Sequence, residues 1–203
     1  NDYNISSVYT NHDYEPYARK RDSEIAAFLE QKNIAFKTYK DQVIFEKEEI
    51  LKDNGEPYTV FTPYSKKWKS RLNPFYLKAY PTEKYTQNFY KNLVSEIHTL
   101  PQLGFEKTGI EFPPDHTSDS IIQQYAKQRD IPGIHGTSRL SVHLRFGTIS
   151  IRAIAVTAKN LSETFLNELI WLDFYQMILW HFPKVADGLS FKPAYDNIEW
   201  RKD

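Results

Sequence analysis

The chain has 203 residues, of which 40% are hydrophobic, and its 26 basic side chains equal its 26 acidic ones in number. This composition predicts a globular, cytoplasmic protein, and any nucleic acid partner would have to be bound by a local basic patch, since the chain has no overall positive field. The sequence contains no cysteine, which excludes disulfides, thiolate metal sites and a cysteine nucleophile, and we predict neither a metal site nor a membrane-spanning helix.

The first 45 residues follow the order strand, helix, strand that is typical of a parallel α/β sheet. We predict strands over residues 5–11, 34–39 and 42–45. The helix between the first two strands is predicted to be capped by Asp13, with Pro16 in its first turn. One such unit cannot cover both faces of a parallel sheet. Because the sequence also opens without a methionine, inside a strand-like pattern, we expect a larger α/β domain whose earlier strands are missing.

Residues 73–117 are rich in proline and aromatic side chains and lack a sustained period, so we interpret them as a connector between two domains. One helix is predicted within this connector, over residues 83–100, because apolar side chains recur there at every fourth position. These side chains are Tyr85, Phe89, Leu93 and Ile97.

From residue 118 onward the periodicity is helical throughout, which predicts an all-α domain that is itself unfinished. Four helices are expected: residues 121–130 after a cap at Ser118 or Asp119, residues 137–146 ending at Gly147, residues 151–160 capped by Ser150, and residues 165–182 ending before Pro183. The longest apolar run, within the last of these helices, contains two acidic side chains, so we expect a buried helix there and not a membrane span.

The segment GTSRLS, residues 136–141, offers the first candidate site. Free backbone N–H groups and hydroxyls converge at the start of the predicted helix, with Ser141 one turn along on the same face as Thr137. Such a helix start is able to bind an anion, including the pyrophosphate of a dinucleotide. By itself, however, this pattern is more often a plain helix cap.

A succession of longer motifs gives this segment a context. YAKQRDIPGIHGTSRLS is followed by NELIWLDFYQMILWHFP, and both are preceded by TNHDYEPYARKRD and GEPYTVFTPYSKKW. In this order the motifs closely resemble the cryptochrome and DNA photolyase family, and within that family the bacterial deoxyribodipyrimidine photolyases. The resemblance covers essentially the whole chain and implies a sequence that is cut at both ends.

The resemblance implies a fold class of α/β followed by all-α. Residues 1–72 would be the C-terminal end of a Rossmann-like parallel α/β antenna domain, residues 73–117 the inter-domain connector, and residues 118–203 the first part of an all-helical FAD-binding domain. A full-length protein of this kind is expected to be monomeric. The fragment is expected to be inactive alone, because the rest of the flavin pocket is not in this sequence.

The resemblance also implies roles for individual residues. The FAD site would be lined by Tyr125, Thr137, Ser138, Arg139, Leu140 and Ser141. Arg129 would contact a DNA phosphate. Glu168 and Trp171 would meet a flipped-out pyrimidine dimer as catalytic and DNA-binding residues, with Tyr175 beside them, and the spacing of the three puts them on one helix face. Trp200 would be the outermost tryptophan of a chain that carries electrons to the flavin.

The implied activity is light-driven DNA repair, in which excited, reduced FAD passes an electron to a cyclobutane pyrimidine dimer, the ring splits and the electron returns. A protonated Glu168 would stabilise the transient dimer anion. The main alternative is a cryptochrome, which binds FAD and signals without repairing DNA, and a helical scaffold without flavin is a third hypothesis. The presence of both Glu168 and Trp171 favours repair.

Two places in the sequence depart from the family pattern. Family members usually have an arginine directly after the tryptophan of ELIW, where it pairs with the flavin phosphates, but this chain has Leu172. Either another cation replaces that arginine or the affinity for FAD falls. The positions at which folate-binding members carry Asn and Glu hold Tyr17 and Ala18, so the antenna chromophore stays unknown.

Overall fold

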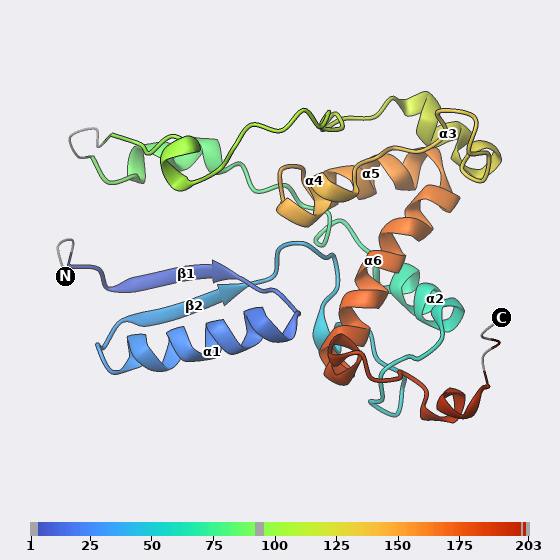
Figure 1. Cartoon of the computed structure of the whole chain (residues 1–203), viewed down its shortest axis with the longest axis horizontal. Coiled ribbons are helices and arrows are strands. Elements are labelled where there is room, and N and C mark those ends of the chain that lie inside the picture. Colours follow the sequence, from blue (N-terminus) through green and yellow to red (C-terminus); the bar gives the residue numbers. More distant parts are fainter. Residues whose placement is uncertain (1–3, 92–95, 200, 202–203) are drawn as a thin grey trace.

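The structure is a computed structural model that describes residues 4–91, 96–199 and 201. Its first part consists of β1 (Ser7–Asn11), α1 (Pro16–Glu30) and β2 (Ala35–Tyr39). The two strands pair in parallel, with Ser7 opposite Ala35 and Asn11 opposite Tyr39, and α1 packs against β2 (Figure 1). The predicted parallel strand, helix, strand unit is therefore confirmed.

The start of α1 differs from the prediction at its cap. Pro16 does occupy the first turn, but the N-cap residue is Glu15, whose side chain makes no capping hydrogen bond. Asp13 accepts a hydrogen bond from the Glu15 N–H at 3.2 Å and forms an ion pair with Arg145 of the helical part at 3.2 Å. Because Asp13 lies two residues before the cap position, its carboxylate serves these partners and not the free N–H groups of the first turn.

Residues 42–45 do not form the predicted third strand. The chain bends there, although Val43, Ile44 and Phe45 are almost completely buried. The backbone N–H groups of Ile44 and Phe45 donate to the carboxylate of Asp173, at 3.2 and 2.9 Å, so they are satisfied without a neighbouring strand. A short apolar run by itself does not distinguish between these two outcomes.

Asp173 joins three parts of the chain. It lies on α6 (Glu163–His181) and accepts, besides the two backbone N–H groups, a hydrogen bond from the Trp68 indole of α2 (Phe61–Arg71) at 2.7 Å. Both Asp173 and Trp68 are essentially inaccessible to water. Burial raises the pKa of Asp173 to about 7, although the three donors act in the opposite direction.

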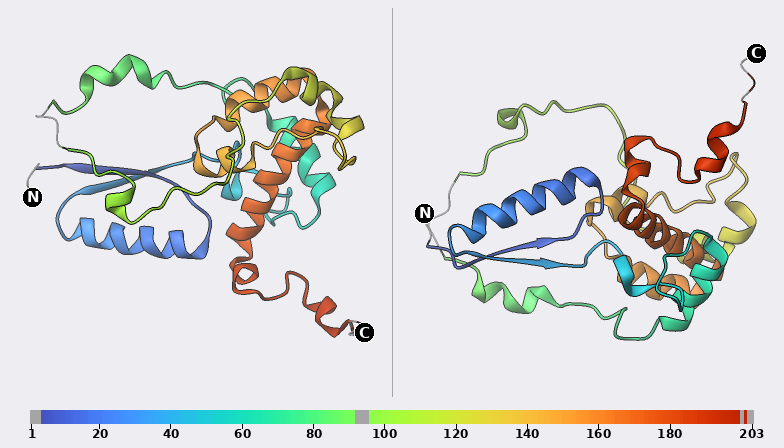
Figure 2. Two further views of the ribbon diagram at one scale, coloured as in Figure 1. Left: turned by 45° about the horizontal axis from the view of Figure 1, so that its top comes forward. Right: turned by 90° about the horizontal axis from the view of Figure 1, so that it is seen from below.

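The helical part of the chain packs around α6, which is seen nearly end-on in the right view of Figure 2. α2, α3 and α5 each contact α6, and α3 also contacts α5. The remaining elements are η1 (Lys47–Glu49), η2 (Thr82–Asn88), η3 (Pro101–Leu103), α3 (Asp119–Gln128), α4 (Ser141–Phe146), α5 (Ile151–Leu161), η4 (Pro183–Asp187) and η5 (Pro193–Asn197), where η marks a 3-10 helix. None of the described helices is both long enough and apolar enough to cross a membrane.

Hydroxyl caps define the starts of three helices. Ser118 accepts a hydrogen bond from the first turn of α3, Ser150 from that of α5 and Ser162 from that of α6. The predicted caps at Ser118 and Ser150 are thus confirmed, as is the end of α6 before Pro183. The domain boundary after residue 72 stays a prediction. α2 precedes this boundary in the sequence but packs against α6 of the helical part.

The helix predicted over residues 137–146 is shorter than expected. α4 begins at Ser141, and the four preceding residues form an irregular segment in which Arg139 has a φ of +55°. Gly147 ends the helix, as predicted, with a φ of +66°. Thr137 therefore lies outside the helix and does not share a helix face with Ser141.

The described residues of the connector do not form the helix predicted over residues 83–100. The helical elements of its described part are the short η2 and η3. Tyr85, Phe89 and Ile97 are all more than half exposed, and Leu93 lies outside the described residues. Figures 1 and 2 show the described residues of this segment running out along the α/β unit, away from the helices that pack around α6. A four-residue repeat stabilises a helix mainly through packing of its apolar face, and these side chains have no such contact.

Replacing Asp173 with alanine is expected to lower the free energy of unfolding by about 3 kcal/mol, because three buried donors lose their acceptor. The measurement is urea-induced unfolding followed by far-ultraviolet circular dichroism. Asp187→Ala, at an exposed position of η4, is the matched control and should change stability by less than about 0.5 kcal/mol. An unchanged unfolding free energy in Asp173→Ala would contradict the joining role of this carboxylate.

The raised pKa of Asp173 predicts how stability depends on pH. The pKa of this group is 3.8 in the unfolded chain and about 7 in the folded one, so the folded chain holds an extra proton between these values. The stabilisation from this group is complete below about pH 4, and about 4 kcal/mol of it is lost as the pH rises through about 7. Urea unfolding at about pH 5 and about pH 8 measures the part of this loss that falls in that range, about 3 kcal/mol, which Asp173→Ala should not show. Parallel pH curves for the two proteins would refute the assignment.

Candidate functional site

A pocket of about 240 Å³ lies between α4 and α6. It is lined by Gln42, Tyr125, Ser138, Leu140, Ser141, Leu144, Arg145, Phe165, Glu168, Leu169, Leu172 and Gln176. The α6 residues in this wall recur at intervals of one, three or four positions, so they form one continuous stripe of the helix. Five of the residues that the sequence singled out, namely Tyr125, Ser138, Leu140, Ser141 and Glu168, therefore meet in one cavity.

Within the GTSRLS segment, the structure separates residues that line the pocket from those that do not. Ser138 and Ser141 bring hydroxyls to its wall, and Leu140, which is almost fully buried, lines it as well. Thr137 and Arg139 are exposed and lie outside this wall. Arg139 belongs instead to a neighbouring hollow beside residues 110–114.

At Gly136 the GTSRLS segment passes close to Gln128, the last residue of α3. A Cβ atom at this position would lie 2.7 Å from both the Cβ and the carbonyl oxygen of Gln128, which is closer than such atoms approach. Only glycine therefore allows the passage. The irregular turn follows at once, which is why α4 starts after Leu140 and not at Thr137 as predicted.

Arg129 and Glu168, for which separate roles toward DNA were expected, form an ion pair in the structure. The Glu168 carboxylate raises the pKa of Arg129, and the guanidinium carbon lies 5.7 Å from the centre of the Tyr125 ring. Burial, and then the same carboxylate, raise the pKa of the Tyr125 hydroxyl. About a third of each charged side chain is exposed, so the pair is worth only about 0–1 kcal/mol and exchanges readily with another partner.

Trp171 does not line the pocket, although it follows Glu168 of the pocket wall by three residues on α6. Its indole stacks on the Phe61 ring of α2, with ring centres 3.7 Å apart and planes 5° apart, and on Tyr175 with ring centres 5.3 Å apart. Phe61 therefore covers one face of the indole, while Tyr175 is more than half exposed. No local pattern identifies Phe61 as part of the site, because only the packing of α2 on α6 brings it to Trp171.

Arg145 and Glu168 are the charged residues of the pocket wall in the described part of the chain. Arg145, on α4, forms ion pairs with Asp13 at 3.2 Å and Glu15 at 3.0 Å, both from the connection between β1 and α1. Leu172 lines the pocket at the position where the family pattern has an arginine. The α6 wall of the pocket therefore offers no cation to a ligand.

The residues of the pocket fit part of a flavin dinucleotide. The hydroxyls of Ser138 and Ser141 suit phosphate or ribityl oxygens, and the apolar wall that includes Phe165 suits a ring system. The buried Oε1 of Gln176 has no hydrogen-bond partner among the described residues and could accept from a ligand. The volume of about 240 Å³ is below the range of about 300–1,000 Å³ for sites that enclose a drug-sized ligand. These residues would therefore line one side of FAD.

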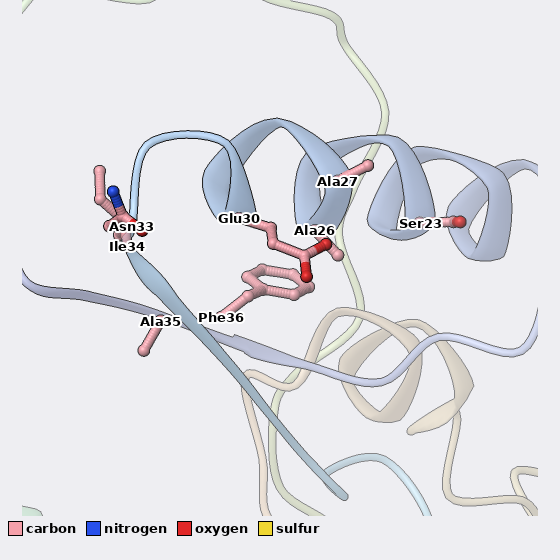
Figure 3. Close-up of a pocket in the computed structure, with 8 residues that line it drawn as sticks. All are labelled: Ser23, Ala26, Ala27, Glu30, Asn33, Ile34, Ala35 and Phe36. Carbon is pink, nitrogen blue, oxygen red and sulfur yellow. The ribbon is translucent and has the colours of Figure 1, made fainter.

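A larger hollow of about 740 Å³ lies at the C-terminal end of α1, between this helix and β2 (Figure 3). Its lining includes Ala26, Ala27 and Phe36, and Glu30 is its one charged side chain. None of the candidate residues lies there. Trp200 falls outside the described residues, and within them no group of three or more histidine or acidic side chains is placed to hold a metal ion.

Comparison with known proteins identifies the family. The family model described as DNA photolyase matches residues 1–84. A deoxyribodipyrimidine photo-lyase of Synechococcus sp. is 35% identical over an alignment of 223 residues, which covers 96% of this chain and 46% of the relative. The chain belongs to the DNA photolyase family. It spans about half the length of the relatives that it matches.

Solved structures of DNA photolyases share this fold. A bacterial class III photolyase from Agrobacterium tumefaciens matches 98% of this chain and 45% of its own length with a TM-score of 0.72 at 19% identity. An archaeal photolyase from Sulfolobus tokodaii, described with two FAD molecules, matches 97% of this chain and 44% of its own length with a TM-score of 0.64 at 25% identity. The combination of a parallel α/β unit with a helical part is confirmed, while the domain boundaries stay a prediction.

Replacing Gln176 with leucine is expected to raise the free energy of unfolding by about 1 kcal/mol. The substitution removes a buried acceptor without a partner, which costs about 1–3 kcal/mol, and adds an apolar side chain beside Leu172. Urea unfolding measures the change, and Gln124→Leu, at an exposed position of α3, should stay within about 0.5 kcal/mol of the unaltered chain. A less stable Gln176→Leu would show that the amide has a partner in solution.

Proposed function

We propose that this member of the DNA photolyase family works in light-dependent DNA repair, by splitting cyclobutane pyrimidine dimers with electrons from excited, reduced FAD. The observation that carries the proposal is the pocket that joins Ser138, Ser141 and Glu168, with Trp171 three residues after Glu168 on the same helix. A flavin in this pocket and a damaged base at the indole would be neighbours. Such proximity is what a protein must provide for a cofactor that carries out the reaction.

FAD would be held by the residues of the pocket wall, namely Tyr125, Ser138, Leu140 and Ser141, with Thr137 and Arg139 in the flanking turn. When bound, the reduced flavin supplies the light-driven electron transfer to the dimer. The chain itself contributes two hydroxyls, an apolar wall and a partly enclosed setting that limits the access of water. The Sulfolobus photolyase described with FAD supports this choice of cofactor.

Trp171 and Glu168 would meet the flipped-out lesion. Phe61 stacks on the indole and holds its orientation, so the partly exposed ring is pre-organised to stack a base. Glu168 is paired with Arg129 in the absence of DNA. A DNA phosphate that binds Arg129 would release the carboxyl group of Glu168 for the polar edge of the lesion.

Binding of damaged DNA tests this proposal. The FAD-loaded chain is titrated, with fluorescence anisotropy as the readout, against a duplex that carries one cyclobutane thymine dimer and against the same duplex without it. We expect tighter binding of the damaged duplex, and Trp171→Ala should reduce the preference about tenfold, because stacking of a base on an aromatic ring is worth about 1–3 kcal/mol. Trp180→Ala, which removes a tryptophan of α6 outside the pocket, is the matched control and should keep the preference.

Arg129→Gln should weaken the binding of the undamaged duplex, because it removes a phosphate contact, and should reduce the salt dependence of binding by about one charge. The loss for the damaged duplex should be no larger, because the substitution also frees Glu168 from its ion pair. Equal affinities of the unaltered chain for damaged and undamaged DNA would contradict the repair proposal. That outcome would favour a light receptor of the cryptochrome type, with flavin but without repair activity.

A further inference from the structure

The pocket between α4 and α6 lacks an obvious partner for the charge of a dinucleotide. A dinucleotide carries a pyrophosphate with two negative charges, and burial of these charges without a cation is costly. The α6 wall offers none, since Leu172 stands where the family pattern has an arginine. In the described structure Arg145 of α4 is the only cation that lines the pocket.

Arg145 is well placed to bind a phosphate. It follows Ser141 by four residues, so the two side chains lie on the same face of α4, and both line the pocket. Its guanidinium donates to Asp13 Oδ2 at 3.2 Å, Glu15 Oε1 at 3.0 Å and Gln42 Oε1 at 3.4 Å. With 44% of the Arg145 side chain exposed, each of these contacts contributes little and is open to competition.

We propose that Arg145 is the phosphate-binding residue of this pocket, and that it exchanges Asp13 and Glu15 for the phosphates of the bound dinucleotide. A planar guanidinium binds a phosphate through two parallel N–H groups, which gives a stronger contact than separate exposed carboxylates. This role rests on the proposed function, because it takes the pocket to be the FAD site. Binding would break the ion pairs between α4 and the connection from β1 to α1, so occupancy of the pocket would change the contacts of Asp13 and Glu15.

Two probes separate the phosphates from the ring system: FAD carries a pyrophosphate and riboflavin carries none. Quenching of flavin fluorescence gives the affinity of the chain for each probe. Arg145→Gln is expected to weaken FAD binding at least about tenfold and to leave riboflavin binding within about twofold. Glu15→Gln is expected to tighten FAD binding about threefold, because it removes a competitor for the guanidinium. Arg152→Gln, which alters an arginine of α5 outside this pocket, is the control and should change neither affinity.

Unchanged FAD binding in Arg145→Gln overturns the proposal and leaves this residue as an ion-pair contact between α4 and the α/β unit. An equal loss of FAD and riboflavin binding also overturns it, since that result reports damage to the pocket, which circular dichroism of the variant would register. If the unaltered chain binds riboflavin as tightly as FAD, the flavin pocket stands and the phosphate role fails. If it binds neither probe, the flavin site of the proposed function fails, and the role of Arg145 with it.

Discussion

A buried carboxylate is the structural centre of this chain. Asp173 lies near the middle of α6 and accepts hydrogen bonds from the backbone that follows β2 and from the Trp68 indole of α2. A carboxylate that is excluded from water is tolerated only where such donors replace its hydration. The segment after β2 and the helix α2 are therefore both held to one point of α6, and the parallel α/β unit is attached to the helical part through that point.

Three stripes of residues on α6 make different contacts. Asp173 accepts a hydrogen bond from Trp68 of α2, and a second stripe of α6, which ends at Gln176, lines the pocket. Trp171 belongs to a third stripe, where its indole stacks on Phe61 at the start of α2. Glu168 lies between the second and third stripes, so it lines the pocket and is also near the indole. One rigid helix, fixed by its buried carboxylate, thus sets the separation between the proposed flavin and the proposed lesion.

Local patterns predict the parallel strand, helix, strand unit, the hydroxyl caps of α3 and α5, and the end of α6 before Pro183. In these elements the apolar period or the cap residue stands in the segment itself, and the tertiary contacts agree with it. Such patterns mispredict residues 42–45, because their backbone hydrogen bonds go to Asp173, far along the chain. They also mispredict the described part of residues 83–100, where Tyr85, Phe89 and Ile97 are more than half exposed and do not form the buried face that would stabilise a helix. Of the eleven site residues that the resemblance implied, five line one pocket: Tyr125, Ser138, Leu140, Ser141 and Glu168. Phe61 enters the site only through the packing of α2 on α6, whereas Arg145 follows Ser141 by four residues on α4.

The central claim is that the facing walls of α4 and α6 form the flavin site, and amide hydrogen exchange with and without FAD tests it most directly. Bound FAD should slow exchange in residues 138–145 and 165–176, which include these walls, and leave residues 23–36 unchanged, where the larger hollow of Figure 3 lies. Protection by bound flavin that is confined to residues 23–36, or that leaves α4 and α6 unaffected, would contradict the account.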